Sequence, residues 1–173
     1  MNQTTKTVFI TGASRGIGRA IAIRFAAAGY RLALCCRHNS DMLRKLQTLI
    51  TEQYHTDCLI YTADTGNYSQ MASMLNDTIQ HFHHIDVLVN NAGISYIGLL
   101  TDMSSEDWQN ILSTNLTSVF NSCRLTVPGM VPKRFFTAPV YRVMPWVFSL
   151  GRSMTTSALW VKAVCVSCLA RTP

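Results

Sequence analysis

Three glycines lie between an apolar run and a run of helical type near the start of the chain. Gly12, Gly16 and Gly18 have the spacing G-x-x-x-G-x-G, follow residues 8–10 (Val-Phe-Ile), and precede the helical run 19–28. Glycine allows a sharp turn and a close approach of backbone to an anion, and the start of a helix favours negative charge. The motif therefore predicts a cradle for the pyrophosphate of a dinucleotide, with an ordinary strand-turn-helix connection as the alternative.

The residues after the loop separate this cradle from other phosphate loops. A Walker-type loop ends in Gly-Lys followed by Ser or Thr, because the lysine reaches the terminal phosphates and the hydroxyl holds magnesium. Here Gly18 is followed by Arg19 and Ala20, which excludes an ATPase or GTPase loop. A methyltransferase is not excluded by the loop alone.

Length and composition favour one globular domain. The chain has 173 residues, of which 48% are hydrophobic, enough for a substantial core. The N-terminus lacks a basic stretch followed by an apolar one, and no uncharged apolar run approaches the roughly 18 residues that span a bilayer. We expect a cytoplasmic protein with no membrane segment.

The positive charge is concentrated in the last part of the chain. The formal net charge is +6; residues 1–133 hold ten Lys and Arg against nine acids, whereas residues 134–173 hold five basic residues and no acid. The basic residues of that segment are isolated among apolar ones, so they form no patch that would follow a phosphate backbone. We expect no nucleic-acid partner.

Cysteine and histidine patterns do not predict a metal site. The six cysteines lie mostly in apolar runs, which favours reduced core thiols over disulfides, and the pair Cys165 and Cys168 has no second pair at ligand spacing. His81, His83 and His84 are spaced so that they do not share one helix face, and they suit the C-terminal end of a helix.

Apolar β-branched runs alternate with segments of helical period. We predict strands at 7–11, 31–36, 57–63 and 85–90, and helices at 17–28, 40–54, 68–82 and 105–126, with Asp41, Ser69 and Ser105 near helix starts. This alternation predicts an α/β fold with a doubly wound parallel sheet and right-handed crossovers. If the strand order is 3-2-1-4 with the further strands absent, the fourth strand forms an edge of the sheet.

Two predicted strands end in residues suited to an adenosine phosphate. The second ends in Cys36 and Arg37. Dinucleotide folds that bind NAD have an acidic residue at the position of Cys36, which binds the ribose hydroxyls. Because Arg37 and Arg15 could both bind a 2′-phosphate, they predict NADP(H), with NAD(H) as the alternative. The plainer interpretation is that both arginines are solvated surface charges. The third strand ends in Asp64 and Thr65, which suit adenine, unless Asp64 only caps the next helix.

The fourth strand runs into a second motif, Asn90-Asn91-Ala92-Gly93. Together with the loop from Thr11 to Gly18, this motif resembles the short-chain dehydrogenase/reductase family, and the 3-oxoacyl-acyl-carrier-protein reductase group within it. The resemblance covers residues 7–134. It implies a Rossmann fold, an NAD(P)(H) cofactor, a small-molecule carbonyl or alcohol substrate, hydride transfer, and a homo-oligomer.

The resemblance also implies residue roles. The pyrophosphate and adenosine phosphates would be held by Gly12, Ser14, Arg15, Gly16, Ile17 and Gly18. Arg37 would meet the 2′-phosphate, and Asp64 and Thr65 would flank adenine. Asn91, Ala92 and Gly93 would line the ribose side of the cofactor. Asn115 matches the catalytic asparagine of the family, which helps to hold a relay water; in this chain it falls in a helical stripe with Trp108, Leu112 and Val119, and a satisfied core amide is the plainer alternative.

The rest of the family pattern is missing. The family resemblance implies a catalytic tyrosine, a lysine four residues after it and an active-site serine. In this chain no tyrosine has a lysine four residues later, and no strand with an Asn-x-Ser-Ser motif follows the helix that carries Asn115. We therefore expect this chain to be catalytically impaired. We predict a dinucleotide-binding domain at 1–134 and an atypical apolar tail at 135–173. A tail without acids or periodicity is more typical of an out-of-frame ending than of half a domain. The alternative function is a non-catalytic nucleotide-binding or partner-binding remnant of such an enzyme.

Overall fold

A parallel sheet of four strands forms the centre of the protein. The structure is a computed structural model and describes residues 5–130. The strands are β1 (Thr7–Thr11), β2 (Arg31–Cys36), β3 (Cys58–Thr62) and β4 (Val87–Val89). They lie in the order β3-β2-β1-β4, which confirms the predicted strands and their order. Within the described range, β4 pairs with β1 alone, through Val8 and Val87 and the two pairs that follow.

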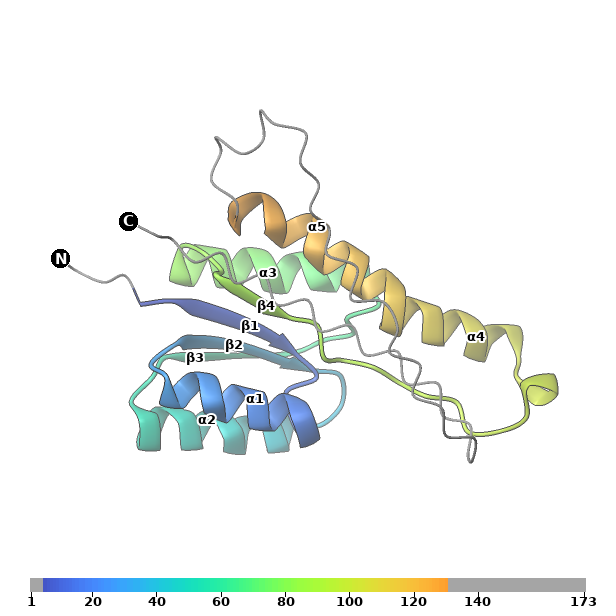
Figure 1. The fold of residues 1–173 in the computed structure, drawn as a ribbon, viewed down its shortest axis with the longest axis horizontal. Helices are drawn as coiled ribbons and strands as arrows, with labels where there is room; N and C mark the ends of the chain where they lie inside the picture. Colours follow the sequence, from blue (N-terminus) through green and yellow to red (C-terminus); the bar gives the residue numbers. More distant parts are fainter. Residues whose placement is uncertain (1–4, 131–173) are drawn as a thin grey trace, which may run out of the picture.

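Helices cover both faces of the sheet (Figure 1). On one face lie α1 (Gly16–Ala27) and α2 (Ser40–Tyr54). On the other lie α3 (Tyr68–Phe82) and α5 (Ser118–Met130), which pack against each other. The helices expected at 17–28, 40–54 and 68–82 are therefore confirmed to within one residue.

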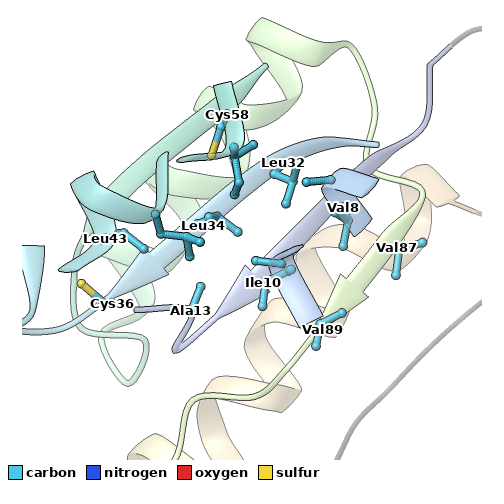
Figure 2. Close-up of a cluster of buried hydrophobic side chains, with 14 residues drawn as sticks. Val8, Ile10, Ala13, Leu32, Leu34, Cys36, Leu43, Cys58, Val87 and Val89 are labelled. Atoms are coloured by element: carbon cyan, nitrogen blue, oxygen red, sulfur yellow. The ribbon is translucent and has the colours of Figure 1, made fainter. Parts of the chain in front are cut away.

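The period-two alternation of the strands divides the core between the two faces. Val8 and Ile10 of β1 point toward α1 and α2, where they join Leu32 and Leu34 of β2 (Figure 2). Phe9, between them in sequence, belongs to the opposite cluster with the buried methionines of α3. Each β1 residue is buried, and the middle of the strand is apolar on both faces, as in a doubly covered parallel strand.

The helix predicted at 105–126 is interrupted. The chain forms a short 3-10 turn at Leu100–Asp102, then α4 (Ser105–Leu112), a π-helical turn at Ser113–Thr117, and α5. A capping box, in which the Ser104 hydroxyl accepts from the Asp107 N–H, begins α4. The π turn adds a residue to one turn and changes which residues share a face. Of the expected stripe, Trp108 is 48% exposed, whereas Leu112, Asn115 and Val119 are half-buried.

Several sequence predictions concern residues beyond this range. The tail at 135–173, with Cys165 and Cys168, lies outside the described residues. Of the other cysteines, Cys35, Cys36 and Cys58 are buried, and Cys123 is half-buried and accepts a hydrogen bond from the Asn90 side-chain amide at 3.6 Å. Among residues 5–130, no helix has both the length and the apolar character needed to cross a bilayer.

Candidate cofactor site

The predicted site residues follow the carboxyl ends of the four strands. The glycine loop follows β1, Arg37 follows β2, Asp64 and Thr65 follow β3, and the segment 90–93 follows β4. Since the sheet is parallel, these ends lie along one edge, with β1 in the middle (Figure 1). In open α/β sheets, ligands bind outside this edge, where the connections leave β1 and β4 in opposite directions.

The three loop glycines are required for different reasons. At Gly12, a Cβ atom would lie 2.9 Å from the Ala92 Cα, and the backbone has a φ of +65°. At Gly18, a Cβ atom would collide with the Gly12 carbonyl and the Asn91 amide. Gly16 has a φ of +55°, yet no described atom lies within 4 Å of the position its Cβ would take. Gly16 therefore opens onto free space, whereas the other two allow backbone segments to approach closely.

The start of α1 faces the same space without a side-chain cap. Arg15 is the N-cap residue; none of the side chains in the described range caps this terminus, and the first turn contains no acid. Arg15 and Ile17 are exposed, and Ile17 retains 54% of its accessible surface. By contrast, α3 and α4 are capped by the side chains of Asn67 and Ser104. The N–H groups and positive dipole end of α1 remain suited to an anion.

Thr11 joins the two sequence motifs. Its hydroxyl accepts hydrogen bonds from the backbone N–H groups of Asn91 and Ala92, both at 2.9 Å, and donates to the Val89 carbonyl at 3.4 Å. The side-chain amide of Asn91 in turn donates to the carbonyls of Thr11 and Gly12, both at 3.0 Å. Asn91 thus holds the glycine loop, while its place near the ribose stays a prediction. Sequence reasoning gave no role to Thr11, although the residue opens the quoted motif.

Ser14 of the glycine loop and Cys36 at the end of β2 are both buried and share a side-chain hydrogen bond. Ser14 is 5% exposed and Cys36 is 4% exposed. Burial raises the pKa of the Cys36 thiol, while hydrogen bonds with the Asn39 backbone and the Ser14 side chain partly oppose this effect. The end of β2 therefore presents a neutral thiol at the position where an acid would repel a 2′-phosphate.

Arg37 and Asp64 form an ion pair between the ends of β2 and β3. The distance from Arg37 Nη2 to Asp64 Oδ2 is 3.1 Å. The second carboxylate oxygen accepts from the Gly66 N–H at 2.8 Å. Asp64 does not cap α3, since Asn67 accepts from the Gln70 N–H instead. The alternative of a capping Asp64 is therefore wrong, whereas Arg37 is exposed and also carries this ion pair.

The turn after β3 reaches the π-helical turn. Thr65 is buried, at 6% exposure, next to Gly66 in sequence. The Ser113 hydroxyl donates to the Gly66 carbonyl at 3.3 Å, and a Cβ at Gly66 would lie 2.6 Å from that hydroxyl oxygen. This contact connects the turn after β3 to the segment that carries Asn115. Ser113 was missed because its partner lies 47 residues away in sequence.

Asn115 lies within the π-helical turn and holds the loop after β4. Its Oδ1 accepts from the Ile94 N–H at 2.9 Å, and its Nδ2 donates to the Ile94 carbonyl at 2.8 Å. The Ser118 N–H reaches back to the Ser113 carbonyl, the five-residue spacing of a π turn. Asn115 is half-buried, and a Cβ at Gly93 would lie 3.4 Å from its Oδ1. The structure thus brings Asn115 next to the second motif.

A cavity of about 150 Å³ lies between this loop and α4. Its lining includes Arg37, Ile94, Tyr96 and Asp107. Arg37 therefore both pairs with Asp64 and lines the cavity beside the second motif. No cluster of three His, Cys, Asp or Glu groups suited to a metal is present in the part of the chain that the structure describes.

Comparison with known proteins decides the family. A family model described as short chain dehydrogenase matches residues 6–135, three quarters of the chain. The chain belongs to the short-chain dehydrogenase family. It is 34% identical, over 132 residues, to the 3-oxoacyl-[acyl-carrier-protein] reductase FabG of Staphylococcus aureus, covering 75% of this chain and 52% of that protein. It is 36% identical, over 133 residues, to dehydrogenase/reductase SDR family member 7B of Bos taurus, covering 73% and 40%.

Solved structures of short-chain dehydrogenases share the fold. The alcohol dehydrogenase of Thermococcus sibiricus, complexed with 5-hydroxy-NADP, matches with a TM-score of 0.69 and 30% identity, over 73% of this chain and 53% of that one. The L-sorbose reductase of Gluconobacter frateurii, complexed with NADPH and L-sorbose, matches with a TM-score of 0.70 and 29% identity, over 73% and 48%. This short-chain dehydrogenase spans about half the length of the curated relatives it matches.

Proposed function

We propose that residues 5–130 form the coenzyme-binding half of an NADP(H)-dependent oxidoreductase. The observation that carries this proposal is the open side of Gly16 beside the uncapped start of α1. A pyrophosphate fits there, because its oxygens can approach the backbone and accept from N–H groups that have no side-chain cap. Two structural relatives are complexed with NADPH or 5-hydroxy-NADP, which supports the 2′-phosphorylated coenzyme.

The other residues have proposed positions around the same ligand. Arg37 would bind the 2′-phosphate with charge-assisted hydrogen bonds, and the neutral Cys36 thiol would not repel it. Asp64 and Thr65 would flank adenine, and Ala92 and Gly93 would border the ribose. Ser14 is only 5% exposed, so it would contact the coenzyme in part and would also hold the loop against Cys36.

The bound coenzyme would supply or accept the hydride in a reaction between a carbonyl and an alcohol. For the whole protein we propose a small-molecule substrate of the 3-oxoacyl type, by analogy with the FabG relative. Asn115 would hold the loop at Ile94 in place beside the reacting groups. Carbonyl reduction produces an alkoxide, which a positioned acid must protonate. A Tyr-x-x-x-Lys pair would supply this acid, and the 173-residue chain has no such pair. We therefore propose that it binds the coenzyme without reducing carbonyls.

A titration of the full chain with NADPH, followed by coenzyme fluorescence, tests the binding proposal. Gly16→Val should weaken NADPH binding by about tenfold or more, since its side chain would enter the space proposed for the pyrophosphate. Gly29→Val is the matched control: Gly29 has a φ of +76° and open surroundings, but follows the far end of α1. It should lose comparable stability and keep its affinity.

The two parts of the proposal can fail separately. Equal NADPH affinity in the wild type and Gly16→Val, or no affinity in a chain whose fold is verified by circular dichroism, would contradict the coenzyme site. Turnover of NADPH with a 3-oxoacyl thioester by the purified 173-residue chain would contradict only the proposed absence of carbonyl reduction.

A further inference from the structure

The ion pair between Arg37 and Asp64 occupies the position at which a coenzyme phosphate would be recognised. Cys36 and Thr62 are the last paired residues of β2 and β3. Arg37 follows Cys36 directly, and Asp64 comes two residues after Thr62. The two side chains meet across these strand ends at 3.1 Å, so the guanidinium is already paired with an anion of the protein itself.

Asp64 is held in place independently of Arg37. Its Oδ1 accepts from the Gly66 N–H at 2.8 Å, and its own backbone N–H donates to the Gln70 side chain at 2.7 Å. These two hydrogen bonds fix the turn and the carboxylate, and leave Oδ2 directed at Arg37. Asp64 would therefore remain in place if the guanidinium moved away.

The Arg37 side chain is exposed and lies beside a cavity, where a second anion could reach it. Its side chain is 46% exposed, compared with 30% for Asp64. It borders the cavity beside Ile94 and Tyr96, and a second carboxylate, that of Asp107, lines the same cavity. A guanidinium has five N–H donors, and the ion pair with Asp64 involves Nη2. A phosphate dianion offers more charge and a bidentate geometry, so it would compete effectively for the same group.

We propose that Asp64 competes with the coenzyme 2′-phosphate for Arg37, and thereby limits the preference of the chain for NADP(H) over NAD(H). This inference rests on the proposed coenzyme function. With NAD(H), which lacks the phosphate, the ion pair stays intact. With NADP(H), Arg37 exchanges the carboxylate for the phosphate, and the cost of breaking the ion pair reduces the affinity. Asp64 is thus a specificity-determining residue through its effect on Arg37.

The ratio of the NADH to the NADPH dissociation constant, measured by fluorescence titration of the full chain, tests the exchange. Adenine contacts are common to both coenzymes and cancel in the ratio. Asp64→Asn keeps an oxygen for the Gly66 N–H and releases Arg37, so the ratio should rise. Partly exposed ion pairs are weak, which corresponds to a rise of about two- to fivefold. The NADH dissociation constant alone should change less.

Two further variants separate the exchange from general electrostatics. Asp57→Asn removes the same charge from an exposed residue just before β3, at the opposite end of the strand, and should leave the ratio unchanged. Arg37→Gln should lower the ratio, and adding Asp64→Asn to it should produce no further rise, because the group under competition is gone.

Each outcome decides the proposal. The proposal is overturned if Asp64→Asn leaves the ratio unchanged, since Asp64 would then have no effect on coenzyme preference. It is also overturned if the ratio falls, since Asp64 would then position Arg37 for the phosphate. It is also overturned if the rise persists in the Arg37→Gln background, because a long-range field would then be responsible. A wild-type chain that is folded but binds neither coenzyme would overturn the proposed function itself, whereas binding with an unchanged ratio overturns only the competition.

Discussion

The side-chain amide of Asn115 forms two hydrogen bonds with the backbone of Ile94, accepting at 2.9 Å and donating at 2.8 Å. The two residues are 21 positions apart, and the contact connects the π-helical turn to the loop after β4. The amide is thus largely used in fixing the loop. The proposed catalytic contribution of Asn115 therefore includes keeping this loop at a defined distance from the helix.

Asn115→Ala should lower the free energy of unfolding by about 1 to 2 kcal/mol, because both hydrogen bonds are lost and the Ile94 backbone groups are half-buried. Urea denaturation measures this loss, and amide hydrogen exchange should accelerate at Ile94. Asn110→Ala, on the exposed surface of α4, is the control and should change stability by less than about 0.5 kcal/mol. Unchanged exchange at Ile94 in Asn115→Ala would contradict the assigned role.

Thr11→Val should be more destabilising than its small change in shape suggests. The substitution leaves the N–H groups of Asn91 and Ala92 without the hydroxyl that accepts from both. We expect a loss of about 2 to 4 kcal/mol in the free energy of unfolding, since unsatisfied partly buried donors are costly. Thr51→Val, where an exposed hydroxyl donates to helix carbonyls, should be nearly neutral. Similar losses for the two variants would argue against this hydroxyl as a link between the motifs.

Gly18→Ala and Gly129→Ala should have effects of opposite sign, although both glycines lie in helices. Alanine normally favours a helix over glycine by about 1 kcal/mol, and at Gly129 no described atom lies within 4 Å of the new methyl group. At Gly18 the methyl would collide with the Gly12 carbonyl and the Asn91 amide, which should cost about 1 to 3 kcal/mol. Thermal unfolding of both variants measures the contrast; a stabilised Gly18→Ala would mean that loop and helix are less closely packed.

Two buried thiols should make the fold sensitive to alkaline pH. Burial raises the pKa of Cys35 and of Cys58 from 9.0 to about 12. Below pH 9 both the folded and the unfolded chain keep the two thiol protons, so the two thiols do not reduce the free energy of unfolding. Between pH 9 and about 12 the unfolded chain loses protons that the folded chain retains, so stability falls as pH rises.

Between pH 8 and pH 10, each of the two thiols should lower the free energy of unfolding by roughly 1 kcal/mol. Urea denaturation at pH 8 and pH 10 measures the decrease. Cys58→Ala provides the comparison, because one titrating group is removed and the decrease between the two pH values should be smaller. An identical decrease in the variant would show that other groups cause the alkaline loss.

The strands were predictable because local pattern determines them. Val8, Phe9 and Ile10 are all apolar, which indicates a strand covered on both faces. A right-handed crossover links the face that a helix covers to the side on which the next strand lies, so β2 and β4 lie on opposite sides of β1 because α1 and α3 cover opposite faces of the sheet (Figure 1). The helix break was not predictable in the same way. Residues 105–126 keep an acceptable helical period, whereas the π turn is accompanied by contacts of Ser113 and Asn115 with loops that are distant in sequence.

The sequence by itself determined the parallel sheet, the glycine loop and the residue types at each strand end, since these depend on periodicity and on the conformational freedom of glycine. Tertiary structure alone decided which side chains serve which neighbour. Arg37 pairs with Asp64, Thr11 accepts from residues 91 and 92, and Asn115 is committed to Ile94. The physical reason is that hydrogen bonds and ion pairs depend on distances of about 3 Å, and between residues 21 to 81 positions apart only the packed fold sets those distances.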